Sequence, residues 1–417
     1  MAEPVSIAPF QGMNNVSHPE GDLRTPEVIL NADNTAQGNL IARQGKKLVK
    51  SLPKAHSLWA NRDVMFVASK GTLYRFDPET EDLSQVTGLG GEGPVFYATV
   101  RTDTEQSVYI SGPGMLGRFD LNSLVMDEWG TALPPRPSVG LVDGELEPGV
   151  YQVCYTKFKD GKMSGNGPIL TVNVPEGKGL FFNNLSDNHI WMTDPGGGEL
   201  QFLGSEKLVT EQPVLSEPLP KFGCKPPEPG LSHIWFYHGR VWGLRGKYLV
   251  YSEPFEPGLF HPANYFDLGE PGTMTAPVDS GMYIGTPQRT FYLNGTDPKQ
   301  ASMKLAGDGV VPGSIAFVKS LPEMSSTLRH HMGSNIPVWM SPSGIYAGSH
   351  EGMVISLTQR KVKLTPAGGA AAAVGRERHG DVQYLTSYKR KQDGTAASFG
   401  DSATADVVRK GKVIEEN

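Results

Sequence analysis

The stretch of sequence that decides the fold is HSLWANRDVMFVASKGTLYRFD, residues 56–77. It contains two short apolar segments, Val64–Ala68 and Thr72–Phe76, which are separated by Lys70-Gly71. Short apolar runs bounded by a glycine turn predict antiparallel strands joined by a tight hairpin. With Ser57–Trp59 as a further strand before them, the stretch predicts a small antiparallel meander.

The same pattern recurs along the chain. A second copy, Val108–Asp120, ends in Arg-Phe-Asp like the first, and three further copies lie at 234–252, 281–295 and 336–357. Repeats of short strands with tight turns are typical of a β-propeller, because a single blade cannot bury both of its faces alone. We predict an all-β fold, a propeller of about six to seven degenerate blades.

The composition supports this prediction. Gly contributes 50 residues and Pro 33 of the 417, a share well above average usage, and both disfavour helix interiors. The 17 Phe, 14 Tyr and 6 Trp need a core, which argues against disorder. The net charge of −6 argues against a typical sequence-specific nucleic-acid binder, and short basic clusters such as Lys389–Lys391 are typical of solvated loops.

The rhythm of the sequence divides the chain. Residues 1–55 are polar, and their prolines are spaced so that no long helix can form. They predict an extended N-terminal arm, followed by the propeller at 56–417. Within the propeller, Val150–Phe158 predicts a longer strand, with Tyr151, Val153 and Tyr155 on one face. A hairpin with an Asp-Gly turn follows, so 139–205 is either an elongated blade or an inserted β subdomain.

Both ends of the chain carry further candidate strands. We expect strands at 28–30 and 41–49 near the N-terminus, and at 382–388 and 405–409 near the C-terminus. Propellers often close by mixing strands from both ends in the last blade, which removes a free edge. The strands near 28–50 and 405–414 are the candidates for such a closure.

No specific catalytic or metal-binding pattern occurs in the sequence, so we predict no enzyme, no cofactor and no metal site. His330 and His331 are adjacent, which on a strand directs them to opposite faces and disfavours a shared metal. The acidic turn at 77–82 lacks the spacing of a calcium loop and predicts a solvated hairpin turn. A carboxylate pair for glycoside hydrolysis could in principle come from Asp267, Glu270 and Asp279.

Buried packing is the simplest interpretation of the remaining conspicuous side chains. Cys154 lies in a predicted strand and is expected to be a buried thiol. Four tryptophans lie in or beside predicted strands, and core packing or a carbohydrate-stacking platform would both use such rings: Trp59, Trp235, Trp242 and Trp339. No apolar run reaches the length of a transmembrane helix and no secretory signal begins the chain, so we expect no membrane association and synthesis in a cytosol.

Several stretches resemble a known family. They are Phe10–Asn15, Asn31–Asn34, Gly38–Gly45, His56–Trp59, Ser232–Gly243, Tyr248–Phe255, Gly258–Phe260, Gly281–Thr286, Tyr292–Pro298 and Val310–Ser314. Together they resemble the β-propeller virion proteins of tailed bacteriophages, similar to the tail nozzle or packaged-DNA stabilisation proteins of short-tailed phages. The chain departs from the family pattern in Gln11–Asn15 and in Ala42–Gly45, which lacks a second arginine.

The resemblance implies a structural role in the virion tail, made in the cytoplasm of a bacterial host. It implies a homo-oligomer, a hexameric ring that extends the DNA channel below portal or head-to-tail adaptor proteins and helps retain and release the genome. Tail fibre or spike proteins would be neighbours, and DNA would pass without sequence specificity. Two alternatives remain: an adaptor that joins the tail to fibres or spikes, and a propeller glycosidase or lyase acting on a host glycan.

Overall fold

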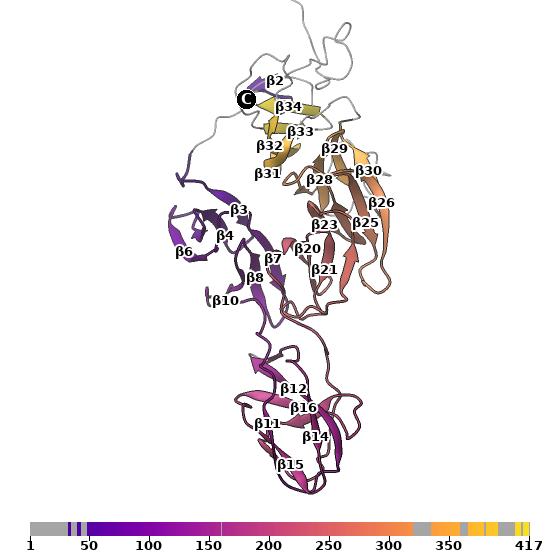
Figure 1. Ribbon diagram of the computed structural model, residues 1–417. Coiled ribbons are helices and arrows are strands. Elements are labelled where there is room, and N and C mark those ends of the chain that lie inside the picture. Colours follow the sequence, from indigo (N-terminus) through magenta and orange to yellow (C-terminus); the bar gives the residue numbers. More distant parts are fainter. Residues whose placement is uncertain are drawn as a thin grey trace, which may run out of the picture. The chain divides into compact units, whose positions relative to one another are not determined.

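The computed structural model describes residues 32–34, 40–42, 48–159, 161–319, 335–358, 366–378, 381–390, 405–409 and 412–416. Within these ranges every helix or strand element is a β-strand (Figure 1). The all-β class predicted from the sequence is confirmed.

Six four-stranded sheets share one topology, in which each strand pairs with the next strand along the chain. The first two comprise β3 (His56–Ala60), β4 (Met65–Ser69), β5 (Thr72–Phe76), β6 (Leu83–Gly88), then β7 (Phe96–Arg101), β8 (Gln106–Ser111), β9 (Leu116–Asp120), β10 (Met126–Glu128). The third and fourth comprise β19 (Ser232–Tyr237), β20 (Arg240–Arg245), β21 (Tyr248–Tyr251), β22 (Tyr265–Asp267), then β23 (Met274–Val278), β24 (Gly281–Gly285), β25 (Arg289–Asn294), β26 (Ser302–Asp308). The last two comprise β27 (Ala316–Val318), β28 (Ile336–Ser341), β29 (Gly344–Gly348), β30 (Val354–Ser356), then β31 (Pro366–Arg378), β32 (Asp381–Arg390), β33 (Ala405–Arg409), β34 (Lys412–Glu416).

A four-stranded antiparallel meander is the blade of a β-propeller. The predicted propeller is therefore confirmed, with six blades among the described residues, at the lower end of the predicted six to seven. The chain divides into two compact units, Met1–Ser51 with Leu244–Tyr248 and Asp267–Asn417, and Leu52–Gly243 with Leu249–Phe266. We call them unit 1 and unit 2.

In unit 2, aromatic rings fill the core of the first two blades. Trp59 stacks on Tyr97 with 5.0 Å between ring centroids, and Phe66 meets Phe119 edge-on at 5.2 Å. Phe66 is fully buried, and Tyr97 and Phe119 nearly so. Rings of this size fill the wedge between two blades with few side chains, which explains the aromatic content of the sequence.

The repeated Arg-Phe-Asp forms the same turn in both of these blades, after β5 and after β9. The carboxylate oxygen Oδ1 of Asp77 accepts hydrogen bonds from the backbone N–H groups of Glu79 and Thr80, at 2.9 and 3.3 Å. Asp120 Oδ1 accepts the equivalent bonds from Asn122 and Ser123, at 3.0 and 2.8 Å. The aspartate satisfies the backbone of a turn that joins the third and fourth strands, so the acidic stretch at 77–82 is a hairpin turn, as predicted.

Replacing Asp120 by alanine should destabilise the second blade by about 1 kcal/mol, because two backbone donors lose their acceptor. Backbone hydrogen bonding from Ser123 lowers the pKa of Asp120, so this contribution is present at neutral pH and is lost as the pH falls through that lowered value. Urea unfolding at pH 7 measures the change. Asp120→Asn keeps the acceptor oxygen and should lose clearly less; equal losses would show that the turn bonds are not the cause.

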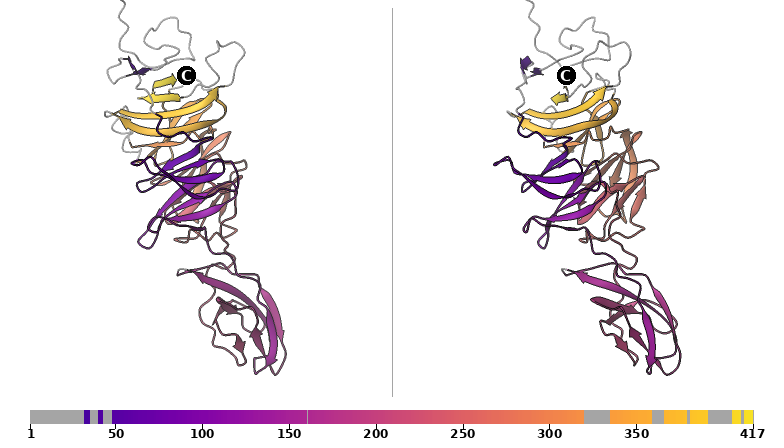
Figure 2. Two further views of the ribbon diagram at one scale, coloured as in Figure 1. Left: turned by 90° about the vertical axis from the view of Figure 1, so that its left-hand side faces the viewer. Right: turned by 60° about the vertical axis from the view of Figure 1, so that its left-hand side comes forward.

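Two further sheets lie between β10 and β19 (magenta in Figures 1 and 2). One comprises β11 (Val139–Asp143), β15 (Lys178–Phe182) and β18 (Leu208–Val209). The other comprises β12 (Gly149–Lys159), β13 (Lys162–Met163), β14 (Leu170–Val174), β16 (Asn188–Met192) and β17 (Gln201–Gly204). Residues 139–209 therefore form an inserted two-sheet subdomain, which we call the insert, and not an elongated blade.

Side chains that alternate between the two faces of β12 form the core of the insert. Tyr151, Val153 and Tyr155 are fully buried and pack in one cluster with Leu180 and Phe182 of the other sheet. The shared face predicted for these three residues is confirmed. The turn after β12 contains Gly161 at φ +73°, a left-handed conformation that glycine adopts without strain.

The closure predicted from both chain ends is wrong for the described residues. The last blade takes all four strands from 366–416, whereas β1 (Ala32–Asn34) and β2 (Leu40–Ala42) pair with each other. The long strands β31 and β32 pair with each other, so β33 and β34 complete the sheet without an N-terminal strand. The strand predicted at 28–30 and most of the arm lie outside the described residues. Of the strand predicted at 41–49, residues 41–42 belong to β2, residues 48–49 form no strand, and the others lie outside the described residues.

In unit 1, β24, β25 and β28 bring three large rings together. Tyr283, Tyr292 and Trp339 are all nearly or fully buried, and the Tyr283 ring lies 5.0 Å from Tyr292 and 5.3 Å from Trp339. The Tyr283 hydroxyl donates towards the backbone carbonyls of Ser349 and Met353, at 2.8 and 2.9 Å. The polar tip of a buried ring is thus satisfied by the backbone of the following blade.

Candidate functional site

Both connections of the insert run past one loop, residues 252–264, between β21 and β22. The indole Nε1 of Trp129, just after β10, donates to the carbonyl of Pro257 at 2.8 Å. On the returning connection, Lys225 and Phe260 exchange two backbone hydrogen bonds of 2.9 and 2.7 Å. The loop therefore contacts both the segment that enters the insert and the segment that leaves it, and we call this place the junction.

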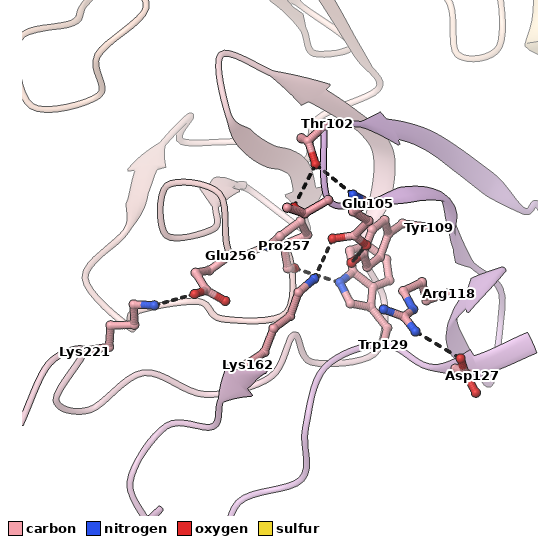
Figure 3. A network of polar contacts seen from close by, with 11 residues as sticks. Thr102, Glu105, Tyr109, Arg118, Asp127, Trp129, Lys162, Lys221, Glu256 and Pro257 are labelled. Atoms are coloured by element: carbon pink, nitrogen blue, oxygen red, sulfur yellow. Dashed lines mark hydrogen bonds and ion pairs between the residues drawn. The ribbon is translucent and has the colours of Figure 1, made fainter. Parts of the chain in front are cut away.

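A buried carboxylate links the insert to the second blade at the junction (Figure 3). Lys162 Nζ in β13 donates to Glu105 Oε2 at 2.5 Å, and the Tyr109 hydroxyl donates to Glu105 Oε1 at 2.5 Å. The Glu105 side chain is only 8% exposed. Burial, together with the Glu105 carboxylate, raises the pKa of Tyr109, so its hydroxyl remains a donor at neutral pH.

Two more ion pairs surround this carboxylate. Arg118 Nη2 donates to Asp127 Oδ2 at 3.0 Å across the register pair of β9 and β10. Lys221, on the returning connection, donates to Glu256 at 2.6 Å (Figure 3). Several of these groups line a pocket, whose charged residues are Arg118, Asp127, Glu128, Lys159, Lys162 and Glu256.

At the junction, the backbone of the insert packs directly against the backbone of its returning connection. A Cβ on Gly165 would lie 1.8 Å from the carbonyl oxygen of Cys224, so no other residue fits there without displacing the returning connection. The Asn166 side-chain oxygen accepts a hydrogen bond of 2.7 Å from the backbone N–H of Gly223. The turn Ser164–Gly167 is therefore the point at which the insert is fixed to its own connection.

Two of the three carboxylates considered for glycoside hydrolysis have separate partners. Asp267 accepts from Lys247 at 2.9 Å, and Glu270 accepts from the Thr286 hydroxyl at 2.7 Å. Asp279 follows β23, in the turn before β24. His330 and His331 lie outside the described residues, as does Lys391 of the basic cluster.

The tryptophans and cysteines are mostly core residues. Trp242 and Trp339 are 1% exposed, whereas Trp59 and Trp235 are partly exposed. Both cysteines are buried free thiols, and burial raises the pKa of Cys154 to about 12 and that of Cys224 to about 11, which leaves them protonated. The prediction of a buried thiol at Cys154 is confirmed.

Sequence reasoning did not identify the junction residues. Glu105 and Lys162 are far apart in the sequence, and Trp129 lies outside the five repeated strand patterns. The available signal was Pro134-Pro135 and Pro226-Pro227, which lie in the two connections of the insert. Among the described residues there is no group of three or more metal-ligating side chains, and none forms a helix able to span a membrane.

Replacing Lys162 by methionine should loosen the insert, because Glu105 would keep a buried charge with one partner fewer. We expect a loss of about 1–3 kcal/mol in local stability, seen as faster amide hydrogen exchange in residues 129–138 and 219–230. Lys178→Met is the matched control, because its pair with Asp143 is exposed to solvent and should contribute little to stability. Unchanged exchange in Lys162→Met would mean that this ion pair does not fasten the insert.

No family model matches the chain, and no curated protein matches it. Among solved structures it is similar to YjhT, at 11% identity and a TM-score of 0.32, over 88% of this chain and 97% of that one. It is also similar to the N-terminal domain of Nup159, at 12% identity and a TM-score of 0.30, over 79% of this chain and 71% of that one. The AfRom2 CNH domain is similar at 8% identity and a TM-score of 0.26, over 76% of this chain and 92% of that one. At these identities and TM-scores, the assignment of the fold rests on the strand topology: the chain is a β-propeller protein with an inserted β subdomain.

Proposed function

We propose that this chain is a structural subunit of a bacteriophage tail, one that forms a nozzle-like ring, extends the DNA channel and helps retain and release the packaged genome. In this proposal six copies assemble in the virion, below portal or adaptor proteins and beside fibres or spikes. Synthesis takes place in the host cytoplasm.

The observation that carries the proposal is the position of the motifs that resemble phage tail proteins. Ser232–Gly243 coincides with β19, its turn and the start of β20, Tyr248–Ser252 with β21, and Gly281–Thr286 with β24. None of the resembling stretches lies in the insert. Apart from the N-terminal stretches within 10–45, the resemblance thus concerns the blades and their loops, the part of the chain that would form a ring, whereas the insert is an addition to it.

Charge is consistent with a channel that DNA passes through. The net charge is −6, so the average field of the subunit repels phosphate. A basic wall would release counterions and bind DNA, which would slow its passage. We therefore expect the purified protein to give no stable complex with duplex DNA at physiological salt in a gel-shift assay.

The alternative role of an adaptor for fibres or spikes draws on one observation. The sheet β11-β15-β18 of the insert carries exposed apolar side chains, including Leu141, Phe181 and Leu208. Exposed apolar residues on a subdomain are typical of protein-binding surfaces.

Native mass spectrometry and electron cryomicroscopy of the purified full-length protein, with a copy count in the virion, test the proposal. A six-membered ring and six copies per particle are the expected results. Three, twelve or more copies would favour the adaptor role. A monomer absent from virions, or one that turns over host glycans, would contradict the proposal.

A further inference from the structure

The junction pocket displays both signs of charge. Arg118, Lys159 and Lys162 provide donors, while Asp127, Glu128 and Glu256 provide carboxylate acceptors. The Arg118 side chain is 21% exposed, and no described residue accepts a hydrogen bond from its buried Nε. A ligand in this pocket can therefore both donate and accept hydrogen bonds.

An aromatic strip begins at the same pocket. Met163 lines the pocket and is the register partner of Phe158 on β12. The Phe158 ring lies 4.8 Å from His189, and His189 lies 5.7 Å from Phe202, so the rings cross the three adjacent strands β12, β16 and β17. We call Phe158, His189 and Phe202 the aromatic strip.

The strip lies on the face of β12 opposite the core of the insert, beside a second buried cluster that contains Trp191. Phe202 packs against this cluster, and its ring lies 5.1 Å from that of Trp191. Tyr151, Val153 and Tyr155 occupy the opposite face of β12 and are buried. Phe158 is 50% exposed, and His189 and Phe202 are partly exposed. Phe158 is therefore the exposed end of the strip, and the residue that follows it, Lys159, lines the charged pocket.

We propose that the junction pocket and the aromatic strip together bind a neutral oligosaccharide. The C–H faces of sugar rings pack against aromatic rings, and each sugar hydroxyl both donates and accepts hydrogen bonds, which matches a pocket of mixed charge. The three pocket carboxylates offset the three cations, so the pocket offers no net attraction to an anionic ligand. Single-stranded nucleic acid, the other class that stacks on aromatic rings, needs a positively charged groove. This inference does not rest on the proposed tail function.

Isothermal titration calorimetry of the full-length protein tests the proposal, with maltohexaose, chitohexaose and a sulfated heparin hexasaccharide as probes. At least one neutral hexasaccharide should bind saturably at millimolar concentration, and the sulfated one should bind more weakly. Phe158→Ala should weaken the binding about tenfold, the loss of one stacked ring. Lys159→Gln, an exposed pocket residue, should weaken it several-fold.

Phe181→Ala is the matched control, because Phe181 is an exposed phenylalanine on the other sheet of the insert. It should leave binding unchanged, and thermal unfolding should show that all three variants remain folded. The proposal is overturned if no neutral probe binds, if only the sulfated probe binds, or if Phe158→Ala and Phe181→Ala bind like the unmodified protein. Saturation-transfer NMR with the bound probe should show contact with aromatic protons of the strip.

Discussion

Replacing Trp339 by alanine should destabilise unit 1 by about 3–5 kcal/mol, the cost typical of removing a large buried aromatic side chain. Trp339 is 1% exposed and packs against the Tyr283 ring, which in turn contacts Tyr292. The cavity left behind cannot collapse easily, because the hydroxyls of both tyrosines are held by the backbone around Ser349 and His350. Urea unfolding, with hydrogen exchange over β23–β30, measures the loss.

Trp59→Ala is the matched comparison within the same chain. Trp59 is partly exposed and stacks on Tyr97 from the surface side of its cluster, so its removal leaves a gap that water can fill. The expected cost is less than half that of Trp339→Ala. Similar costs for the two variants would contradict the distinction between a core ring and a rim ring.

Acidification should destabilise unit 2 through His233, which packs against the Phe96 ring at 4.6 Å. Burial lowers the pKa of His233 to about 4, from an ordinary value of 6.5. Between these two values the unfolded chain takes up a proton that the folded chain does not, so stability falls as the pH falls from 6.5 towards 4. The expected total loss from this group is about 3 kcal/mol.

His233→Asn isolates this effect. His233 has φ +50°, a left-handed conformation that asparagine adopts more readily than most residues, and asparagine does not titrate. Urea unfolding at pH 7 and at pH 4 should show a smaller acid-induced loss in the variant than in the unmodified protein, by about 3 kcal/mol. Equal losses would show that His233 titrates normally in the folded chain.

The blades could be predicted from the sequence because their information is local. Strand, glycine turn and strand occur within about twenty residues, and the repeated Arg-Phe-Asp marks one turn type twice. Even the long strand of the insert was visible, since the alternation at 151–155 directs three large residues to one face.

The junction could not be predicted because its contacts are not local. Nothing near Glu105 indicates that its partner is Lys162 in another subdomain, and Trp129 is a single ring after a short strand. The aromatic strip has the same origin: Phe158, His189 and Phe202 meet only because β12, β16 and β17 are neighbours. The composition of the last blade was mispredicted for a related reason, since strand pairing between chain ends leaves no local signature.

The neighbouring blades on either side of the insert contact each other without it. Ser111 in β8 donates to the carbonyl of Leu231, just before β19, at 2.6 Å, and Phe96 in β7 meets His233 in β19. Since the loop 252–264 also contacts both connections of the insert, the segment behaves as a cassette with adjacent ends. A segment with adjacent ends can be removed or replaced without changing the blades. Its sequence can therefore change during evolution while the blades keep their structure.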